Sequence, residues 1–400
     1  MGIRRVYVIG TCDTKQAELA YACDRVRAAG ATPVLVDVST HGLGSRADVP
    51  ATEIAACHPD GADAVLGSGD RGTAVTRMAE ALTCWLLARN DIGAVLGLGG
   101  SGNTALVTQA MRALPVGVPK LMVSTVASGQ VAPYVGATDL GMVHSVTDVA
   151  GLNAISRRVI GNAAHAAAGM AQNTIADAPD DLPGVGVTMF GVTTTCVDHL
   201  RAELSGKAEP YVFHATGTGG AAMEKLAESG LVAGLLDVTA TEIADHLVGG
   251  VMPCSPDRYG VVARTGIPWV GSVGAVDMVN FAGRDTVPDK FSDRHLLVHN
   301  PQITLMRTTP PENVQIARFL TERLNRCNGP VALFLPLGGV SAVDAPGMPF
   351  HDPVANDALF ATIRDTFTPG PNRRLIELPL HINDPAFATA MAAEFLRMLP

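Results

Sequence analysis

The feature of this sequence that most restricts its fold is an alternation of short β-branched runs with longer helical patterns, joined by glycine-rich loops. The runs occupy residues 5–9, 32–38, 64–66, 92–98 and 120–124 in the first half, and residues 185–190, 211–214, 235–238, 267–270, 296–299, 331–335 and 375–380 in the second. Strands that alternate with helices are typical of βαβ units with a parallel sheet. We therefore predict an α/β protein built from two Rossmann-like, doubly wound subdomains with mostly parallel sheets.

A polar, acidic segment separates the two halves. Residues 173–184 contain three aspartates and two prolines, and the alternation of strands and helices restarts after them. Such composition is typical of a linker between domains. We predict an amino-terminal subdomain over residues 1–178 that binds a nucleotide, and a carboxy-terminal subdomain over residues 179–400 with a crevice for a substrate or partner.

Composition excludes several classes of protein. Hydrophobic residues make up 47% of the 400 residues and charged residues 17%, which excludes an intrinsically disordered chain. A net charge of −9 argues against a nucleic-acid binder, because such proteins carry a basic face. The seven cysteines are scattered and include no CxxC pair, which indicates reduced thiols in a cytoplasmic protein. We expect no signal peptide and no membrane segment.

The strongest motif is the glycine-rich loop at residues 99–104. It lies between an apolar run and a helical pattern, where the start of a helix offers unpaired amides and a partial positive charge. Phosphate sites at helix starts are built in this way. The loop matches neither the P-loop nor GxGxxG, so it identifies no nucleotide by itself. A tight turn without a ligand is the alternative.

Three further loops end strands of the same half. Because the ligand crevice of an open α/β sheet lies outside the carboxyl ends of its strands, all four loops are predicted to line one pocket. Asp13 could hold a ribose hydroxyl or a water on Mg²⁺, or cap the helix that begins there, as could Thr14. The predicted ligand-binding residues are Thr11, Asp13, Thr14, Lys15, Ser68, Asp70, Arg71, Gly99, Gly100, Ser101, Gly102, Asn103, Thr104, Ser124, Thr125 and Ser128.

The second half offers a second predicted crevice and a catalytic hypothesis. Cys196 near a helix start could have a lowered pKa and act as a nucleophile, with His214 as its base and Asp198 orienting that base. The alternative is that Cys196 is a buried core residue. The predicted second crevice consists of Thr193, Thr194, Thr216, Gly217, Thr218, Gly219 and Gly220.

The motifs together, in this order, resemble one family over nearly the whole chain: the ATP-binding family typified by the amino-terminal domain of a plant tobamovirus-resistance protein. The resemblance is carried by residues 10–15, 99–104, 124–129, 213–220, 277–281 and 381–385. It implies two Rossmann-like subdomains, ATP with Mg²⁺ in the amino-terminal one, and a homodimer or larger homo-oligomer. Asn103 stands where the family pattern has glycine, and asparagine adopts positive φ more readily than most residues.

The leading functional hypothesis is therefore an ATP-binding protein that uses Mg-ATP in a step on a small carboxylated metabolite. The metal ligands are not predicted. One alternative is a nucleotide-independent hydrolase or lyase that uses Cys196, Asp198 and His214. Another is a non-catalytic, nucleotide-sensing module that binds a protein partner. An NAD-dependent dehydrogenase is disfavoured because no GxGxxG follows the first strand, although Asp37 stands where a ribose ligand would lie.

Overall fold

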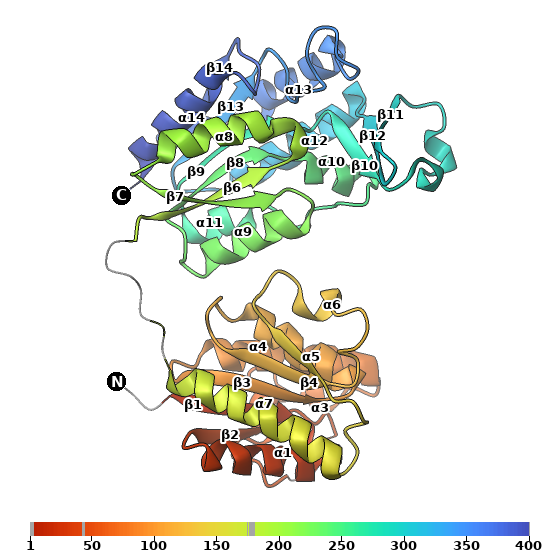
Figure 1. The fold of residues 1–400 in the computed structure, drawn as a ribbon, viewed down its shortest axis with the longest axis vertical. Helices are drawn as coiled ribbons and strands as arrows, with labels where there is room; N and C mark the ends of the chain where they lie inside the picture. The colour runs from red at the N-terminus through yellow and green to blue at the C-terminus, as the bar shows by residue number, and fades with distance from the viewer. Residues whose placement is uncertain (1–3, 42–44, 174, 176–180, 400) are drawn as a thin grey trace. The chain divides into compact units, whose positions relative to one another are not determined.

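Two compact units, Met1–Ala178 and Pro179–Pro400, make up the chain (Figure 1). The structure is a computed structural model that describes residues 4–41, 45–173, 175 and 181–399. Each unit has a parallel sheet with helices on both faces, which confirms the predicted fold class. Half of the predicted linker at residues 173–184 lies outside the described residues, and its last residue, Gly184, begins a strand.

The amino-terminal unit contains one parallel sheet in the order β2-β1-β3-β4-β5. Its strands are β1 (Arg5–Gly10), β2 (Thr32–Asp37), β3 (Ile92–Gly99), β4 (Lys120–Ser124) and β5 (Gly141–His144). The central strands β1 and β3 are buried along almost their whole length, since helices cover both faces of the sheet. Because β2 and β3 lie on opposite sides of β1, the strand order reverses between β1 and β3.

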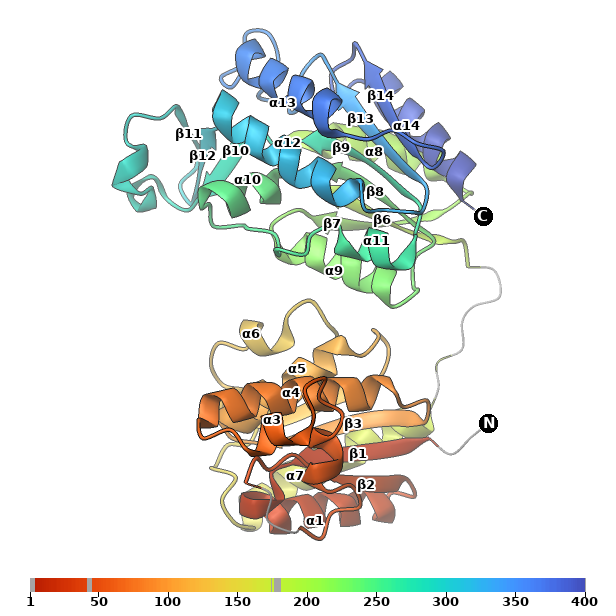
Figure 2. The same cartoon turned by 180° about the vertical axis from the view of Figure 1, so that it is seen from behind.

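Helices cover the two faces of this sheet, each over its own apolar core (Figures 1 and 2). One face is covered by α1 (Cys12–Ala28) and α7 (Ala154–Gln172). The other is covered by α2 (Ala51–Ala55), α3 (Ala62–Leu66), α4 (Arg71–Leu87) and α5 (Ser101–Ala113), with the short α6 (Ala132–Val135) beside α5. The predicted strand at residues 64–66 was wrong: these residues lie in helix α3 and pack against α4.

The carboxy-terminal unit contains a larger parallel sheet in the order β14-β13-β9-β8-β6-β7. Its strands are β6 (Gly184–Met189), β7 (Glu209–His214), β8 (Gly234–Thr239), β9 (Trp269–Gly274), β13 (Val331–Pro336) and β14 (Arg373–Leu378). One face packs against α8 (Thr194–Leu204) and α14 (Pro385–Met398). The other packs against α9 (Thr218–Glu228), α10 (Thr241–Val248), α11 (Gly260–Thr265), α12 (Pro310–Leu324) and α13 (Pro353–Thr366).

A small antiparallel sheet, which the sequence pattern did not predict, is inserted in this unit. It has the order β10-β12-β11, formed by β10 (Met278–Phe281), β11 (Leu296–Asn300) and β12 (Ile303–Arg307). The predicted strand at residues 296–299 therefore exists, but it belongs to this insertion and not to the parallel sheet. Among the described residues, none of the helices combines the length and the apolar character that crossing a bilayer requires.

Candidate functional site

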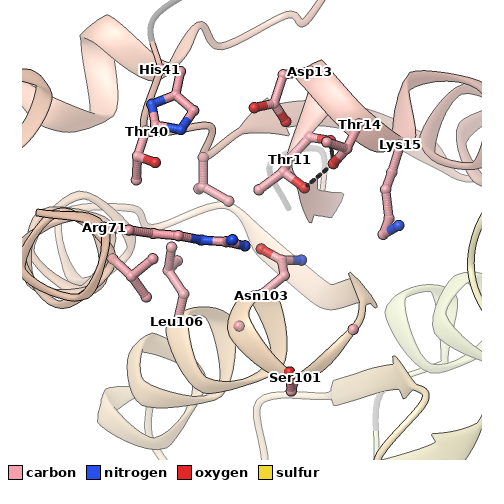
Figure 3. A pocket seen from close by; sticks show the side chains of 14 residues that line it. Thr11, Asp13, Thr14, Lys15, Thr40, His41, Arg71, Ser101, Asn103 and Leu106 are labelled. Carbon is pink, nitrogen blue, oxygen red and sulfur yellow. Dashed lines mark hydrogen bonds between the residues drawn. The ribbon is translucent and has the colours of Figure 1, made fainter.

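A cavity of about 400 Å³ opens in the amino-terminal unit at the carboxyl ends of its central strands (Figure 3). The loops after β1, β2 and β3 and the start of α4 meet there, next to the point where the strand order reverses. Ligands of open α/β sheets bind at this position. The cavity is lined by Thr11, Asp13, Thr14, Lys15, Val38, Thr40, His41, Arg71, Val75, Gly100, Ser101, Gly102, Asn103 and Leu106.

The amino terminus of α5 forms one wall of this cavity. Its capping residue, Gly100, has no side chain to accept a hydrogen bond from the first-turn amides, so α5 has no side-chain cap. A Cβ at Gly102 would meet no atom within 4 Å, and one at Gly100 would come no nearer than 3.8 Å to Thr125 Oγ1. The start of this 13-residue helix is therefore open to a ligand, with the positive end of its dipole facing the cavity.

Asn103 contributes an unpartnered polar atom to the same wall. Its side-chain Nδ2 donates a hydrogen bond to the carbonyl of Leu98 at 2.5 Å. Its Oδ1 has no hydrogen-bond partner among the described residues, although Asn103 is only 8% exposed. Asn103 has no positive φ; it lies in the first turn of α5, so the predicted reason for an asparagine here was wrong. In Figure 3 its carboxamide points toward the side chain of Arg71.

The two cations of the cavity differ in how they are held. Arg71 begins α4 and is exposed, and in the described part of the chain no carboxylate pairs with its guanidinium. Lys15 interrupts α1 with a non-helical backbone (φ −133°, ψ 27°), and its Nζ donates a hydrogen bond to the carbonyl of Val149. Arg71 is thus the cation that is free to meet an anion, whereas the ammonium of Lys15 already has a partner.

The residues that follow β1 bring hydroxyls and one carboxylate to the opposite wall of the cavity (Figure 3). The Oγ1 atoms of Thr11 and Thr14 lie 2.9 Å apart, and the exposed side chain of Asp13 lines the cavity beside them. Among residues 4–41, 45–173, 175 and 181–399, no three His, Cys, Asp or Glu side chains are grouped so as to hold a metal ion. Mg²⁺ is commonly bound through one or two carboxylates together with phosphate oxygens, and Asp13 could supply one such ligand.

Several predicted ligand-binding residues have structural partners instead. Asp70 caps α4, where its Oδ2 accepts hydrogen bonds from the backbone N (2.7 Å) and Oγ1 (2.8 Å) of Thr73, which lowers the pKa of Asp70. Ser124 is fully buried, and its Oγ shares a hydrogen bond of 2.6 Å with Thr104 Oγ1. The predicted residues that do not line the cavity are Ser68, Asp70, Gly99, Thr104, Ser124, Thr125 and Ser128. The loop after β4 therefore supports the cavity from behind and does not enclose it.

Sequence reasoning missed the lining residues Val38, Thr40, His41, Val75 and Leu106. Thr40 and His41 follow β2, and their position after a strand was the signal that could have identified them. Asp37, just before them, is buried. Its Oδ1 accepts hydrogen bonds from Cys12 N at 3.0 Å and from Ser39 N at 2.9 Å, so it joins two loops and does not face the cavity as a ribose ligand would.

The structure contradicts the predicted activation of Cys196. This thiol is fully buried in the core between α8 and the sheet, and burial raises its pKa to about 12, the opposite of the lowered value that a nucleophile needs. Asp198 is exposed and faces Arg201 at 3.7 Å, while the ring of His214 packs edge-on against Phe190. A cysteine nucleophile served by these residues is therefore not supported.

The glycines of the predicted second crevice are surrounded by protein. A Cβ at Gly219 would overlap the carbonyl oxygen of His214, and one at Gly220 would overlap Oε1 of Glu242. Gly217 has φ +81°, and its amide donates a hydrogen bond to Glu242 Oε2 at 2.9 Å. These glycines permit close packing of the loop against the protein. In the described part of this unit, the best-formed cavities are not lined by Thr193, Thr194, Thr216 or Thr218.

A buried ion cluster holds Glu242 in place. Arg258 is 1% exposed and donates hydrogen bonds of 2.6 Å to Glu242, to Asp237 and to Glu224. Glu242 also accepts a hydrogen bond from the amide of Gly217. The ion cluster therefore anchors the loop of residues 216–220 through Gly217. The amide of Gly217 is therefore taken by one of the protein's own carboxylates and is not free for a phosphate.

Family models match both units. The model of the amino-terminal domain of an uncharacterised protein family, UPF0261, matches residues 4–176, and the model of its carboxy-terminal domain matches residues 182–399. The chain belongs to this family. Among its bacterial relatives, a UPF0261 protein of Rhizobium meliloti is 51% identical over 393 residues, which cover 98% of each chain.

The relatives of this chain also include a plant protein. The ToMV resistance protein Tm-1(GCR237) of Solanum lycopersicum is 42% identical over 421 aligned residues, which cover 99% of this chain and 56% of the tomato protein. A UPF0261 protein of Clostridium tetani is 40% identical over 401 residues, or 99% of each chain. The family resemblance predicted from the ordered motifs is thereby confirmed.

Proposed function

We propose that this UPF0261 protein is a cytoplasmic ATP-binding protein that holds Mg-ATP in the cavity of its amino-terminal unit. The observation that carries the proposal is the meeting of three features where the strand order reverses: an uncapped helix start, the Arg71 guanidinium and the Asn103 Oδ1. Among the described residues, the guanidinium has no carboxylate partner and the Oδ1 has no hydrogen-bond donor. Main-chain amides and a guanidinium are suited to phosphate oxygens, and a helix start adds a favourable dipole. A free carboxamide oxygen additionally requires a donor, which a nucleotide or its bound water provides.

The lining residues suggest a division of roles. The first-turn amides of α5, at Ser101, Gly102 and Asn103, would bind phosphate oxygens together with Arg71. The hydroxyls of Thr11 and Thr14 would contact phosphate from the opposite wall, and Asp13 would contact Mg²⁺ directly or through water. Lys15 would contribute its positive charge at a greater distance, since its ammonium already donates to Val149.

What the bound ATP is used for is a separate part of the proposal. We favour an ATP-dependent step on a small carboxylated metabolite over a purely nucleotide-sensing module, because a second cavity with hydrogen-bond donors exists in the other unit. The nucleotide-independent hydrolase or lyase loses its proposed nucleophile, since Cys196 is buried. All seven cysteines are free, in keeping with a reducing, cytoplasmic compartment. A homo-oligomer is proposed on the family resemblance alone, and light scattering on the purified protein tests it.

Isothermal titration with ATP in the presence of Mg²⁺ tests the binding site. A Cβ at Gly102 meets no protein atom within 4 Å, so we expect Gly102→Val to retain its fold and its ATP affinity to fall at least about tenfold, or 1.4 kcal/mol. Gly169→Val on α7 is the matched control, since a Cβ there also meets no atom within 4 Å. Equal affinity for ATP in both variants would show that ATP does not bind in this cavity.

A nucleotide panel tests the identity of the ligand. Thermal unfolding of the full chain is compared with ATP, ADP, NAD and coenzyme A, each with and without Mg²⁺. A ligand at about 100 times its dissociation constant adds about 2.7 kcal/mol to the free energy of unfolding. We expect the largest shift with Mg-ATP; a shift with NAD or coenzyme A alone would refute ATP as the ligand.

A further inference from the structure

A second cavity, of about 270 Å³, lies wholly within the carboxy-terminal unit. It is enclosed by the residues that follow β6, by the last residue of β7 and by the β11–β12 hairpin of the antiparallel insertion. Its volume lies just below the roughly 300–1,000 Å³ typical of ligand pockets. The cavity therefore suits a small molecule.

Most of its wall is apolar. Phe190 and Val192 come from the segment after β6, Ile303 and Leu305 from β12, and Met252 from the loop after α10. Phe190, Val192 and Leu305 are buried, and they belong to a small apolar core that packs the insertion onto the parallel sheet. These side chains are held by the fold, so the apolar wall is preformed.

Three polar side chains line the cavity, all able to donate hydrogen bonds. His214 is exposed and packs the edge of its ring against Phe190, with ring centres 5.1 Å apart. His299 and Asn300 line the cavity from the β11–β12 hairpin. Asn300 Oδ1 already accepts a hydrogen bond of 2.8 Å from the backbone amide of Gln302. The side-chain amide that Asn300 can offer to a ligand is therefore a donor.

Among the residues that line the cavity, none is aspartate or glutamate, and none is lysine or arginine. An amine ligand would find no counter-charge here, and a phosphate dianion would find no strong cation. A single carboxylate fits the set better, because imidazole and amide N–H groups can donate to its two oxygens while the apolar wall takes up a hydrocarbon body.

We propose that this cavity binds a small apolar monocarboxylate, such as an aromatic acid or a short branched aliphatic acid. The carboxylate accepts hydrogen bonds from His214, His299 and Asn300, and the hydrocarbon part packs against Phe190 and Leu305. The proposal deepens the proposed function by identifying where a small acid binds. It does not depend on nucleotide binding, because every lining residue belongs to the carboxy-terminal unit.

Ligand-observed NMR and isothermal titration, performed without nucleotide, test this proposal on the full chain. The probes are benzoate, phenylacetate and isovalerate, with benzyl alcohol as a neutral analogue and benzylamine as a cationic one. We expect at least one acid to bind, and to bind at least tenfold more tightly than benzyl alcohol or benzylamine. Failure of all three acids to bind, or equal binding of benzylamine, would overturn the proposal.

Substitutions at two positions, Gly191 and His214, localise the binding. Gly191→Leu adds a side chain at the cavity wall where a Cβ meets no atom within 4 Å, and it should abolish acid binding without unfolding the protein. His214→Ala should weaken binding at least tenfold, and His214→Gln, which keeps a donor, should recover part of that loss. His165→Ala on α7 of the other unit is the control and should bind the acid as the parent does. Acid binding unchanged by Gly191→Leu would overturn the assignment to this cavity whether or not ATP binds elsewhere.

Discussion

Two of the glycine-rich loops that follow strands invite comparison: residues 99–104 in the amino-terminal unit and residues 216–220 in the carboxy-terminal unit. Their sequences are similar in character, but their surroundings differ. A side chain at Gly102 would enter open space, whereas side chains at Gly219 and Gly220 would overlap protein atoms. Glycine is needed wherever a backbone must be approached closely, and the approaching group can be a ligand or the protein itself. The loop at residues 99–104 is open to a ligand. Around residues 216–220, other atoms of the protein already fill the space beside the glycines.

The largest effect expected from this comparison is that of Gly219→Ala. Its Cβ would overlap the carbonyl of His214, a main-chain atom that cannot move without shifting the end of β7. We expect a loss of at least about 4 kcal/mol in the free energy of unfolding of the carboxy-terminal unit, within the range of severe single substitutions. Urea denaturation followed by far-UV circular dichroism measures it. An unchanged midpoint would show that the loop is not packed as described.

Arg258→Met tests the ion cluster that fixes the second loop. It leaves Glu224, Asp237 and Glu242 without their shared cation, two of them in full burial. Removing one partner from a buried ion pair costs about 3–5 kcal/mol, because the remaining charge stays buried. Arg264→Met, whose guanidinium is exposed, is the control and should change the unfolding free energy by less than about 1 kcal/mol.

A buried carboxyl makes the stability of the carboxy-terminal unit depend on pH. Burial raises the pKa of Asp277 to about 7, with Asp344 adding to this and Arg307 opposing it. A carboxyl with a raised folded-state pKa binds more protons in the folded than in the unfolded chain, whose ordinary value is about 3.9. The free energy of unfolding should therefore fall as pH rises from about 4 to about 7.

Asp277→Asn should flatten that pH dependence, since the amide does not titrate. Asp245, whose pKa burial raises to about 6, contributes in the same direction and remains in the variant. Urea midpoints at several pH values measure the slope for both proteins. The same slope in both would contradict the assignment to Asp277.

The smallest effect expected is that of Gly102→Ala in the open loop. Alanine favours helix over glycine by up to about 1 kcal/mol, and its Cβ meets no atom here. We therefore expect the free energy of unfolding to rise by a few tenths of a kcal/mol to about 1 kcal/mol, opposite in sign to Gly219→Ala. Thermal unfolding without ligand measures it, and a clear loss of stability would mean that this loop is packed as tightly as the second.

Much of the fold could be predicted because buried parallel strands are continuous apolar runs. Residues 92–98 are such a run and form most of β3, flanked on both sides by neighbouring strands. The prediction was wrong at residues 64–66, where three apolar residues are too few to separate a strand from a helical turn. β5 was missed because it is short and only partly buried, so it lacks that apolar signal.

The site could be predicted only in part, because the sequence shows which loops converge and not which side chains already have partners. Arg71 and Gly102 line the cavity as predicted, whereas the hydroxyl of Ser124 bonds to Thr104 and the carboxylate of Asp70 caps a helix. Leu106 reaches the cavity from the second turn of α5, a position that carries no polar signal. Cys196 lies in the first turn of α8, the position predicted for a nucleophile, but its side chain is buried in the core.

Amide hydrogen exchange of the full chain, with and without Mg-ATP, tests the difference between the two loops most directly. The account predicts slower exchange in peptides that contain the start of α5, residues 101–104, and unchanged exchange in peptides from residues 216–220. Protection of the second loop, or saturating ATP without protection at the start of α5, would contradict it.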